Sequence, residues 1–214
     1  MITGERMTNS EARLWRLIEQ RSAPGADTDA IDESIWHLFG EQWAVVFTDL
    51  AGFSRKTEQF GIIHFLQVIH AMHRLLYPVI EQHRGFLIKA EADSLLLLFR
   101  SADDALRCSI AMQHACKQAN ERLVPEEQIL LCLGIGCGQI LRVGNHECWG
   151  SQVNAASKLG EDTAKTDEIL ITDAAREALT AGEFDVDFSE IEEPIPGSAK
   201  NFRVRYEKAA ISRS

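Results

Sequence analysis

Two apolar runs near the middle of the chain are separated by only a short acidic stretch, and this spacing strongly restricts the fold. Residues 86–89 and 94–99 are rich in Leu, Ile and Phe, and residues 90–93 between them read Ala-Glu-Ala-Asp. The pattern predicts a β-hairpin, which makes the two strands antiparallel neighbours in a sheet. Just before it, residues 61–83 repeat apolar side chains at three- and four-residue steps, which predicts a long helix packed on the core.

Strands and helices are interspersed along the rest of the chain. Further strands are predicted at residues 43–48, at 129–135 with a continuation at 139–143, at 168–171, and at 202–206 as an edge strand. Further helices are predicted at residues 101–119, 151–162 and 174–179. Because the hairpins bring antiparallel neighbours and no Gly-x-Gly-x-x-Gly follows a strand, the pattern favours an α+β sandwich over a doubly wound Rossmann sheet.

The N-terminal segment 1–40 differs from the rest and is predicted to be a helical appendage on a main domain at 41–214. Residues 9–21 and 31–39 have short amphipathic patterns, and residues 22–29, with their Pro and Gly, separate the two helices. Two roles stay open for this segment: it packs on the core, or it helps two chains associate.

The charge of the chain limits its partners. The 214 residues include 22 Lys and Arg and 32 Asp and Glu, which gives a net charge of -10. The sequence contains no long basic run. Nucleic acid and membrane surfaces are therefore not expected as partners. No apolar run is long enough to span a bilayer and the N-terminus has no apolar signal core, so a cytoplasmic protein is expected. Five cysteines without a Cys-x-x-Cys pair predict reduced structural thiols rather than a zinc site.

Two aspartates stand where a strand gives way to a turn. Asp49 follows the first predicted strand, and Asp93 lies in the turn of the hairpin. If the strands are adjacent, the two carboxylates repel each other, and a bound divalent cation reverses that repulsion. Surroundings made only of oxygen atoms suit Mg2+ or Mn2+ carrying phosphates. Residues 50–54 then lead into a helical turn whose free N–H groups can receive phosphate oxygens.

Glycines alternate with apolar residues at the end of the predicted strand 129–135 and directly after it. They stand at positions 134, 136 and 138, and no Lys-Ser or Lys-Thr follows them, which excludes a Walker loop. We predict that they permit close packing of the backbone or approach to a ligand.

Three segments in order resemble the catalytic domain of class III nucleotidyl cyclases, over about residues 41–206. Residues 46–54, Val-Phe-Thr-Asp-Leu-Ala-Gly-Phe-Ser, resemble the first metal motif of that family. Residues 89–93, Lys-Ala-Glu-Ala-Asp, resemble its base-selecting lysine and second metal aspartate. Residues 149–158 resemble the helix whose asparagine and basic residue meet ribose and phosphate. The resemblance implies a ferredoxin-like, palm-type α+β sandwich, and makes 41–214 the cyclase catalytic domain.

The resemblance also implies an activity and a site. The protein would be a cytoplasmic homodimer with two composite active sites, each converting a nucleoside triphosphate to a 3′,5′-cyclic monophosphate and pyrophosphate with two divalent metal ions, Mg2+ or Mn2+. The positions that match functional residues of the family are Asp49, Leu50 and Asp93 for the metals, Gly52, Phe53 and Ser54 for phosphate, Lys89 and Glu147 for the base, and Asn154 and Lys158 for catalysis.

The base-reading positions favour ATP. A lysine donor beside an acidic acceptor matches the N1 acceptor and the N6 donor of adenine, whereas guanylyl members of the family carry Glu and Cys at these places. The expected function is therefore an adenylate cyclase that makes cyclic AMP as a second messenger. Two alternatives stay open: a cyclase acting on GTP or a pyrimidine triphosphate, and a catalytically weak nucleotide-binding regulatory module.

Three positions depart from the family pattern. Lys158 stands where the family usually has arginine, which removes a two-pronged donor to phosphate. Ala92 replaces the glycine that usually precedes the second metal aspartate. Residues 195–200 lack the Lys-Gly pair that active members commonly offer to the triphosphate, and Lys200 is the nearest substitute.

Overall fold

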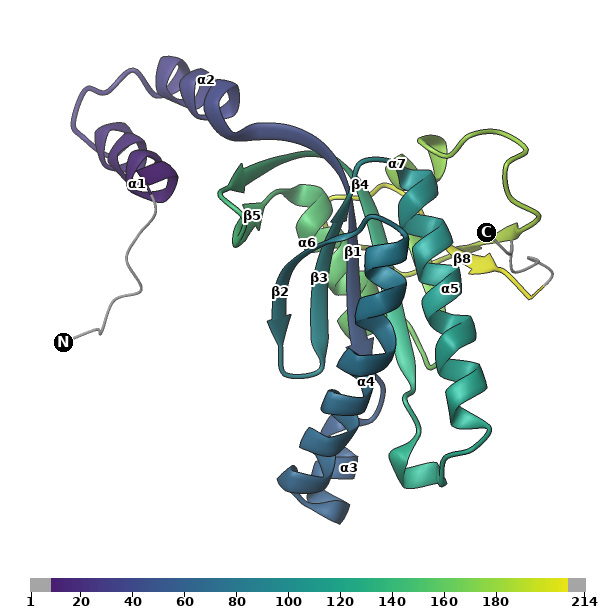
Figure 1. Cartoon of the computed structure of the whole chain (residues 1–214). Helices are drawn as coiled ribbons and strands as arrows, with labels where there is room; N and C mark the ends of the chain where they lie inside the picture. Colours follow the sequence, from purple (N-terminus) through teal and green to yellow (C-terminus); the bar gives the residue numbers. More distant parts are fainter. Residues whose placement is uncertain (1–8, 208–214) are drawn as a thin grey trace.

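The computed structural model describes residues 9–207, apart from the side chains of residues 53–56, and shows an α+β sandwich built on one sheet (Figure 1). The sheet is 8-stranded, in the order β2-β3-β1-β4-β6-β8-β7, with β5 paired to β4. Within the described residues every strand pair is antiparallel except β4 with β6. The predicted fold class is therefore confirmed.

The elements follow the predicted order closely. The strands are β1 (Gly40–Leu50), β2 (Phe86–Glu91), β3 (Ser94–Phe99), β4 (Leu131–Val143), β5 (Glu147–Trp149), β6 (Ile169–Thr172), β7 (Asp187–Ile191) and β8 (Asn201–Arg205). The helices are α1 (Asn9–Arg21), α2 (Thr28–Phe39), α3 (Phe53–Phe60), α4 (Ile62–Gln82), α5 (Ala102–Asn120), α6 (Ser151–Ser157) and α7 (Asp173–Glu177), with a 3-10 helix η1 (Pro125–Glu127) and a π-helix η2 (Lys158–Thr163).

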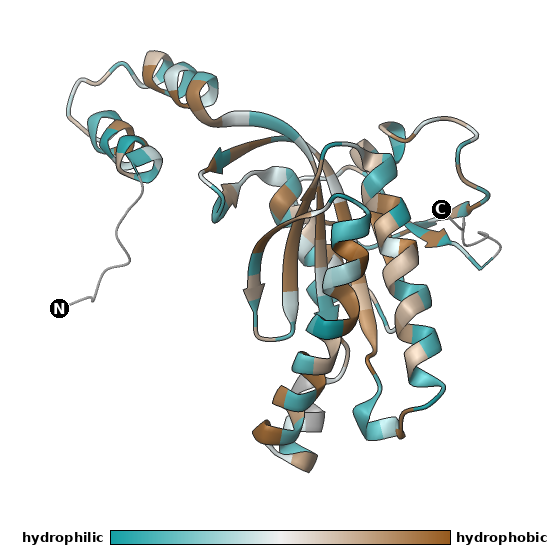
Figure 2. Ribbon diagram, in the orientation of Figure 1, coloured by the Kyte–Doolittle hydropathy of each residue, from teal (hydrophilic) through white to brown (hydrophobic). Residues whose placement is uncertain are grey.

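Helices α4 and α5 cover one face of the sheet and form the main core with it (Figure 1). In Figure 2 the central strands are largely brown, whereas these helices mix brown and teal, as expected of elements with one buried side. The fully buried side chains of this core come from both layers and include Val46, Leu97, Leu133, Ile135, Met72, Leu76 and Leu106. Burial of this much apolar surface is the dominant stabilising contribution.

Helix α6 and the π-helix η2 cover the opposite face, where glycines of β4 replace large side chains. A Cβ on Gly134 would lie 2.1 Å from the carbonyl oxygen of Ala156, and a Cβ on Gly136 would lie 2.5 Å from that of Gln152. Since side chains alternate along a strand, apolar residues of β4 point to α4 and α5 while its glycines face α6. The prediction that these glycines permit close backbone packing is confirmed.

The N-terminal helices form a hairpin that packs on the far end of β4. Leu14 of α1 and Ile35 and Phe39 of α2 are buried in one cluster with Val143. Helix α2 runs directly into β1 at Gly40, so no linker separates the two predicted regions. Of the two roles left open, the structure shows packing against the end of β4, and a role in association of two chains stays a prediction.

Three details of the predicted elements are wrong. Strand β8 lies between β6 and β7 instead of at an edge, because the polar segment 187–191 adds an unpredicted edge strand. Residues 131–143 form one continuous strand, since glycine at 138 fits the ladder and makes room for Gln152. The predicted helix 151–162 changes to a π-helix at Lys158, where the backbone of Gly160 approaches Phe47 and Gly134.

All five cysteines are buried and free. Burial raises the pKa of the Cys108, Cys116 and Cys132 thiols to about 12. The prediction of reduced structural thiols is therefore confirmed.

Candidate functional site

Asp49 and Asp93 lie beside each other at one end of the sheet, as the sequence predicts. Asp49 is near the end of β1, and Asp93 is in the turn between β2 and β3, where Glu91 pairs with Ser94. Because Thr48 pairs with Leu95, the next position of β1 faces Ser94, whose Oγ donates to Asp49 Oδ1 at 3.2 Å. The hairpin and the first strand therefore bring the two carboxylates to one place.

In both carboxyl groups the charged form is disfavoured, so the pKa lies above its ordinary value. Burial, followed by the charge of Asp93, raises the pKa of Asp49 to about 6. Burial also raises the pKa of Asp93, whose residue is only 8% exposed. The backbone amide of Leu50 acts on both groups in the opposite direction. A positive charge placed here would remove most of this penalty.

The donors at this end of the sheet fit a hard divalent cation. Asp49, Asp93 and the backbone of Leu50 offer only oxygen ligands, the kind that Mg2+ and Mn2+ prefer. Among the described residues, no group of three or more His, Cys, Asp or Glu is arranged to hold a metal ion. Mg2+ sites in proteins are usually built from one or two carboxylates together with phosphate oxygens and water.

Lys89 and Glu147 form an ion pair that joins β2 to β5. Lys89 Nζ lies 2.7 Å from Glu147 Oε1 and 3.6 Å from Glu91 Oε1. The hydrogen bond to Glu147 is the main reason that the pKa of Lys89 is raised. About a third of each side chain stays exposed, 36% for Lys89 and 33% for Glu147. The two predicted base-reading residues therefore meet within one chain, with polar atoms open to a ligand.

Asn154 and Lys158 both project from the exposed side of the α6–η2 segment. Their neighbours Val153, Ala155 and Ala156 are buried against the sheet. Lys158 Nζ is paired with the carboxylate of Asp162, one turn further on. The structure thus presents the Asn154 amide to solvent and gives Lys158 a carboxylate partner, and the roles of both residues at ribose and phosphate stay predictions.

The predicted phosphate loop begins at a left-handed residue. Gly52 has φ of 83°, and it is the residue that precedes α3. Glycine adopts this conformation without strain, which explains its position there. The side chains of Phe53 and Ser54 lie outside the described residues, and their role at phosphate stays a prediction.

The structure shows the conformation of Ala92 and the partner of Lys200, two of the residues at which the chain departs from the family pattern. Ala92 has φ of 49°, a conformation that glycine would adopt without strain. Lys200 Nζ lies 3.2 Å from Glu190 Oε2, so this lysine is tied to β7.

Sequence reasoning missed two residues beside the site. The charge of Glu161 contributes to the raised pKa of both Asp49 and Asp93, and Glu161 accepts a hydrogen bond of 2.7 Å from Ser157. Positions 154, 158 and 161 follow helical spacing, a signal that could have placed Glu161 on this side. Gln152 is the second, a polar residue on the buried side of α6.

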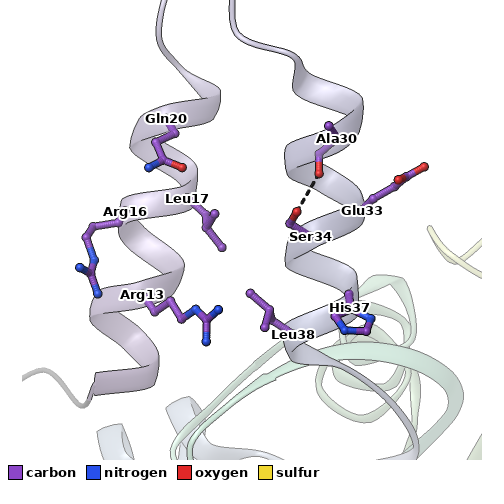
Figure 3. A pocket seen from close by; sticks show the side chains of 9 residues that line it. All are labelled: Arg13, Arg16, Leu17, Gln20, Ala30, Glu33, Ser34, His37 and Leu38. Atoms are coloured by element: carbon purple, nitrogen blue, oxygen red, sulfur yellow. Dashed lines mark hydrogen bonds between the residues drawn. The ribbon is translucent and has the colours of Figure 1, made fainter.

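A groove of about 810 Å³ lies between α1 and α2, away from these residues (Figure 3). Arg13, Leu17 and Leu38 project toward the space between the two helices in Figure 3. Its lining contains none of the predicted site residues. Among the described residues, no helix has the length and hydropathy needed to cross a bilayer.

Fold and site together define a nucleotidyl cyclase catalytic domain. A mainly antiparallel α+β sandwich carries two aspartates at the end of β1 and in the β2–β3 turn, a lysine–glutamate pair between β2 and β5, and an exposed asparagine on α6. The chain belongs to the adenylate and guanylate cyclase catalytic domain family, which matches residues 40–203. Its members are lyases that generally depend on divalent metal ions.

Relatives include adenylate and guanylate cyclases. A putative adenylate cyclase 3 of Rhizobium meliloti (strain 1021) is 30% identical over 145 residues, which cover 68% of this chain and 24% of that protein. An adenylate cyclase of Streptomyces coelicolor is 30% identical over 157 residues, which cover 72% of this chain and 36% of that protein. A receptor-type guanylate cyclase, gcy-20 of Caenorhabditis elegans, is 22% identical, with 82% of this chain and 17% of that protein covered. The chain thus spans about a third or less of these relatives.

Solved structures agree in fold. The adenylate/guanylate cyclase/hydrolase from Silicibacter pomeroyi has a TM-score of 0.65 and 26% identity, covering 77% of this chain and 95% of that one. The guanylyl cyclase Cya2 has a TM-score of 0.66 and 19% identity, covering 77% and 92%.

Proposed function

We propose that this chain is an adenylate cyclase that converts ATP to 3′,5′-cyclic AMP and pyrophosphate for second-messenger signalling. The observation that carries the proposal is the ion pair of Lys89 with Glu147 at 2.7 Å. The lysine can donate to adenine N1, and the glutamate can accept from the adenine N6 amino group. Each holds the other in place before the base arrives, which reduces the entropy lost on binding.

Asp49, Asp93 and the Leu50 carbonyl would hold two divalent ions, Mg2+ or Mn2+. When bound, such ions lower the pKa of a ribose hydroxyl and neutralise the charge of a triphosphate. The chain itself contributes two neighbouring carboxylates whose pKa values are raised by burial, so a positive charge placed beside them would favour their charged forms. The amides that follow Gly52, at the start of α3, would receive phosphate oxygens.

Asn154 and Lys158 would orient the ribose and stabilise negative charge on the transferred phosphorus. Asn154 is exposed and can hydrogen-bond to the ribose. Lys158 must leave Asp162 to reach a phosphate, and it provides a point charge where arginine would provide a fork. We therefore expect a slower enzyme than one carrying arginine at this position.

We also propose the arrangement of the whole protein. Residues 1–40 form the appendage and residues 41–214 the catalytic domain of a homodimer. Each composite site combines the aspartates of one chain with Lys89, Glu147 and the α6 residues of its partner. Such a split site makes specific activity fall on dilution below the dissociation constant of the dimer. The cytoplasmic location expected from the sequence stays a prediction.

The test is to incubate the purified protein with ATP, GTP, CTP and UTP in Mg2+ or Mn2+, and to identify products by mass spectrometry. We expect cyclic AMP from the wild type and none from Asp49→Asn. The double variant Lys89→Glu/Glu147→Cys should shift product toward cyclic GTP, since it carries the pair found in guanylyl members. A cyclic product from another nucleotide would replace ATP as substrate. Binding of a non-reactive triphosphate without product would favour the regulatory module.

A further inference from the structure

Gln152 is a buried polar residue on the inner side of the helix that carries Asn154. It stands in the first turn of α6 and is 8% exposed, against an exposed Asn154 two residues later. Its amide points into the sheet instead of into solvent, so its polar atoms need partners inside the protein.

The Gln152 amide has three such partners, each on a different segment. Its Nε2 donates to the Gly197 carbonyl oxygen at 2.8 Å. Its Oε1 accepts from the Cys137 backbone N–H of β4 at 3.2 Å and from Thr172 Oγ1 at the end of β6 at 3.0 Å. One side chain therefore connects α6 to two strands and to the loop before β8.

The backbone around Gln152 is shaped to admit it. A Cβ on Gly138 would lie 2.8 Å from Gln152 Cγ, and a Cβ on Gly136 would lie 3.2 Å from its Oε1. Gly197 has φ of 92°, and a Cβ there would lie 2.7 Å from the Ser151 carbonyl oxygen. Larger residues at these three positions would force α6 or the 195–200 loop away from the sheet.

We propose that Gln152 is a positioning residue for the cyclase reaction: its amide locks α6 and the 195–200 loop in one arrangement and so places Asn154 and Lys158 for the substrate. The inference rests on the proposed function, since these two residues are the ones assigned to ribose and phosphate. A displacement of about 1 Å in such groups lowers a rate by about 100-fold. Gln152 contributes to catalysis through them, without contact with the substrate.

The variant Gln152→Glu tests this role with little change of shape. A carboxylate keeps the acceptor for Cys137 and Thr172 but cannot donate to the Gly197 carbonyl oxygen. When protonated, the carboxyl group can donate to that oxygen again. We expect kcat to fall about tenfold or more at pH 8 with little change in KM. The ratio of variant to wild-type kcat should rise as the pH falls toward 6, because burial raises the pKa of a carboxyl group.

Gln113→Glu is the matched control. Gln113 is a second buried glutamine, 2% exposed on α5, and its Nε2 donates to the Leu131 and Glu168 carbonyl oxygens on the other face of the sheet. The same substitution there should lower the melting temperature while kcat of the folded protein stays within about twofold of wild type. If both variants lose activity only in proportion to the fraction unfolded, Gln152 is merely structural and the proposal is wrong.

A readout without turnover separates this inference from the proposed function. In Gln152→Met, which keeps the length and removes both polar atoms, hydrogen exchange should accelerate at the Cys137 amide and across residues 195–200. If exchange changes as expected but the wild type makes no cyclic product, the adenylate cyclase proposal fails while the coupling of α6 to the loop stands. Unchanged exchange in a folded variant would overturn the coupling itself.

Discussion

The two faces of the sheet are made by the same strands, yet they are built differently. On the α4–α5 face, strand residues such as Leu97 and Ile135 are large and fully buried. On the α6 face, the glycines of β4 bring helix backbone against strand backbone, and β2, β3 and β1 leave Lys89 and Asp49 accessible. The α4–α5 face provides most of the apolar burial. The α6 face has a smaller apolar cluster, which includes Trp43, Val45 and Leu98, and its glycines let a short helix approach the strand backbone closely.

This difference predicts that one face of the sheet mainly determines stability, whereas the other mainly determines the position of the helix that carries site residues. When a side chain in a deep apolar core is truncated, the fold is retained but its stability falls, because the surrounding residues fill the cavity only in part. A backbone contact has no flexible side chain that can adjust, so an added methyl group must move the helix and everything it carries. Substitutions on adjacent residues of β4 should therefore have effects of different kinds.

Gly134→Ala should give the largest effect on activity. The new methyl group would overlap the Ala156 carbonyl oxygen and lie 2.5 Å from the Gly160 backbone nitrogen. The α6–η2 segment must move, and we expect kcat to fall by about 100-fold or more. Cyclase assays on variant protein shown by circular dichroism to be folded provide the measurement. Near-wild-type activity would contradict the proposal that backbone packing on the α6 face determines activity.

Ile135→Ala, at the next residue, should mainly lower stability. Ile135 is fully buried in the core under α4 and α5. Its truncation should lower the free energy of unfolding by about 2–5 kcal/mol, from lost burial and the cavity left behind. Denaturant unfolding measures this loss. Specific activity of the folded protein at low temperature should match wild type, and a loss as large as that of Gly134→Ala would contradict the comparison.

Asp49→Asn should raise the stability of the metal-free protein at pH 8. The pKa of Asp49 is raised to about 6 by burial and by Asp93, so its charged form is unfavourable in the folded state above that pH. The amide removes this penalty, and we expect an increase in melting temperature of about 2–4 °C, as 1 kcal/mol produces in a domain of this size. Below pH 6 wild-type Asp49 takes up a proton and the difference should shrink. Because the pKa is raised from its ordinary value of 3.8, the difference should shrink gradually between about pH 6 and pH 4, and a difference that is undiminished at about pH 4 would contradict the assigned pKa.

Ala92→Gly should have the smallest effect. Relief of the positive φ at the hairpin turn should raise the free energy of unfolding by about 0.5–1 kcal/mol, after the greater freedom of glycine in the unfolded chain is included. Thermal unfolding in parallel with Mn2+ titration separates this gain from any change at the metal site. A loss of stability would show that the turn prefers alanine.

Much of the fold could be predicted because its signals are local. The hairpin of β2 and β3 and the long helix α4 follow from period-2 and period-3.6 patterns that need no knowledge of the rest of the chain. Strand β7 was missed because its residues, Asp-Phe-Ser-Glu-Ile, carry no apolar run and pair only at an edge of the sheet. The π-helix was missed because the backbone contact at Gly160 with β1 and β4 is not visible in the sequence.

The candidate site could be predicted as a set of residues but not as an arrangement. The family resemblance identified Asp49, Asp93, Lys89 and Glu147, and the structure brings the two aspartates together and the lysine together with the glutamate. Helical spacing alone would pair Lys158 with Asp162, four residues later, but nothing local predicted that Glu161 would add its charge to both aspartates. These contacts depend on where the η2 turn lies against β1, which is a property of the packed molecule.

By itself, the sequence determined the class of fold, the order of the elements, the residue types of the metal and base positions, and the family that they indicate. Only the tertiary structure decided which residues meet, how far burial shifts the pKa of Asp49, and that Gln152 joins α6 to β4, β6 and the 195–200 loop. The physical reason is the distance over which each kind of interaction acts. Periodicity and turn chemistry act between neighbours in the chain, whereas burial, charge repulsion and side-chain hydrogen bonds depend on distances in space between segments far apart in sequence.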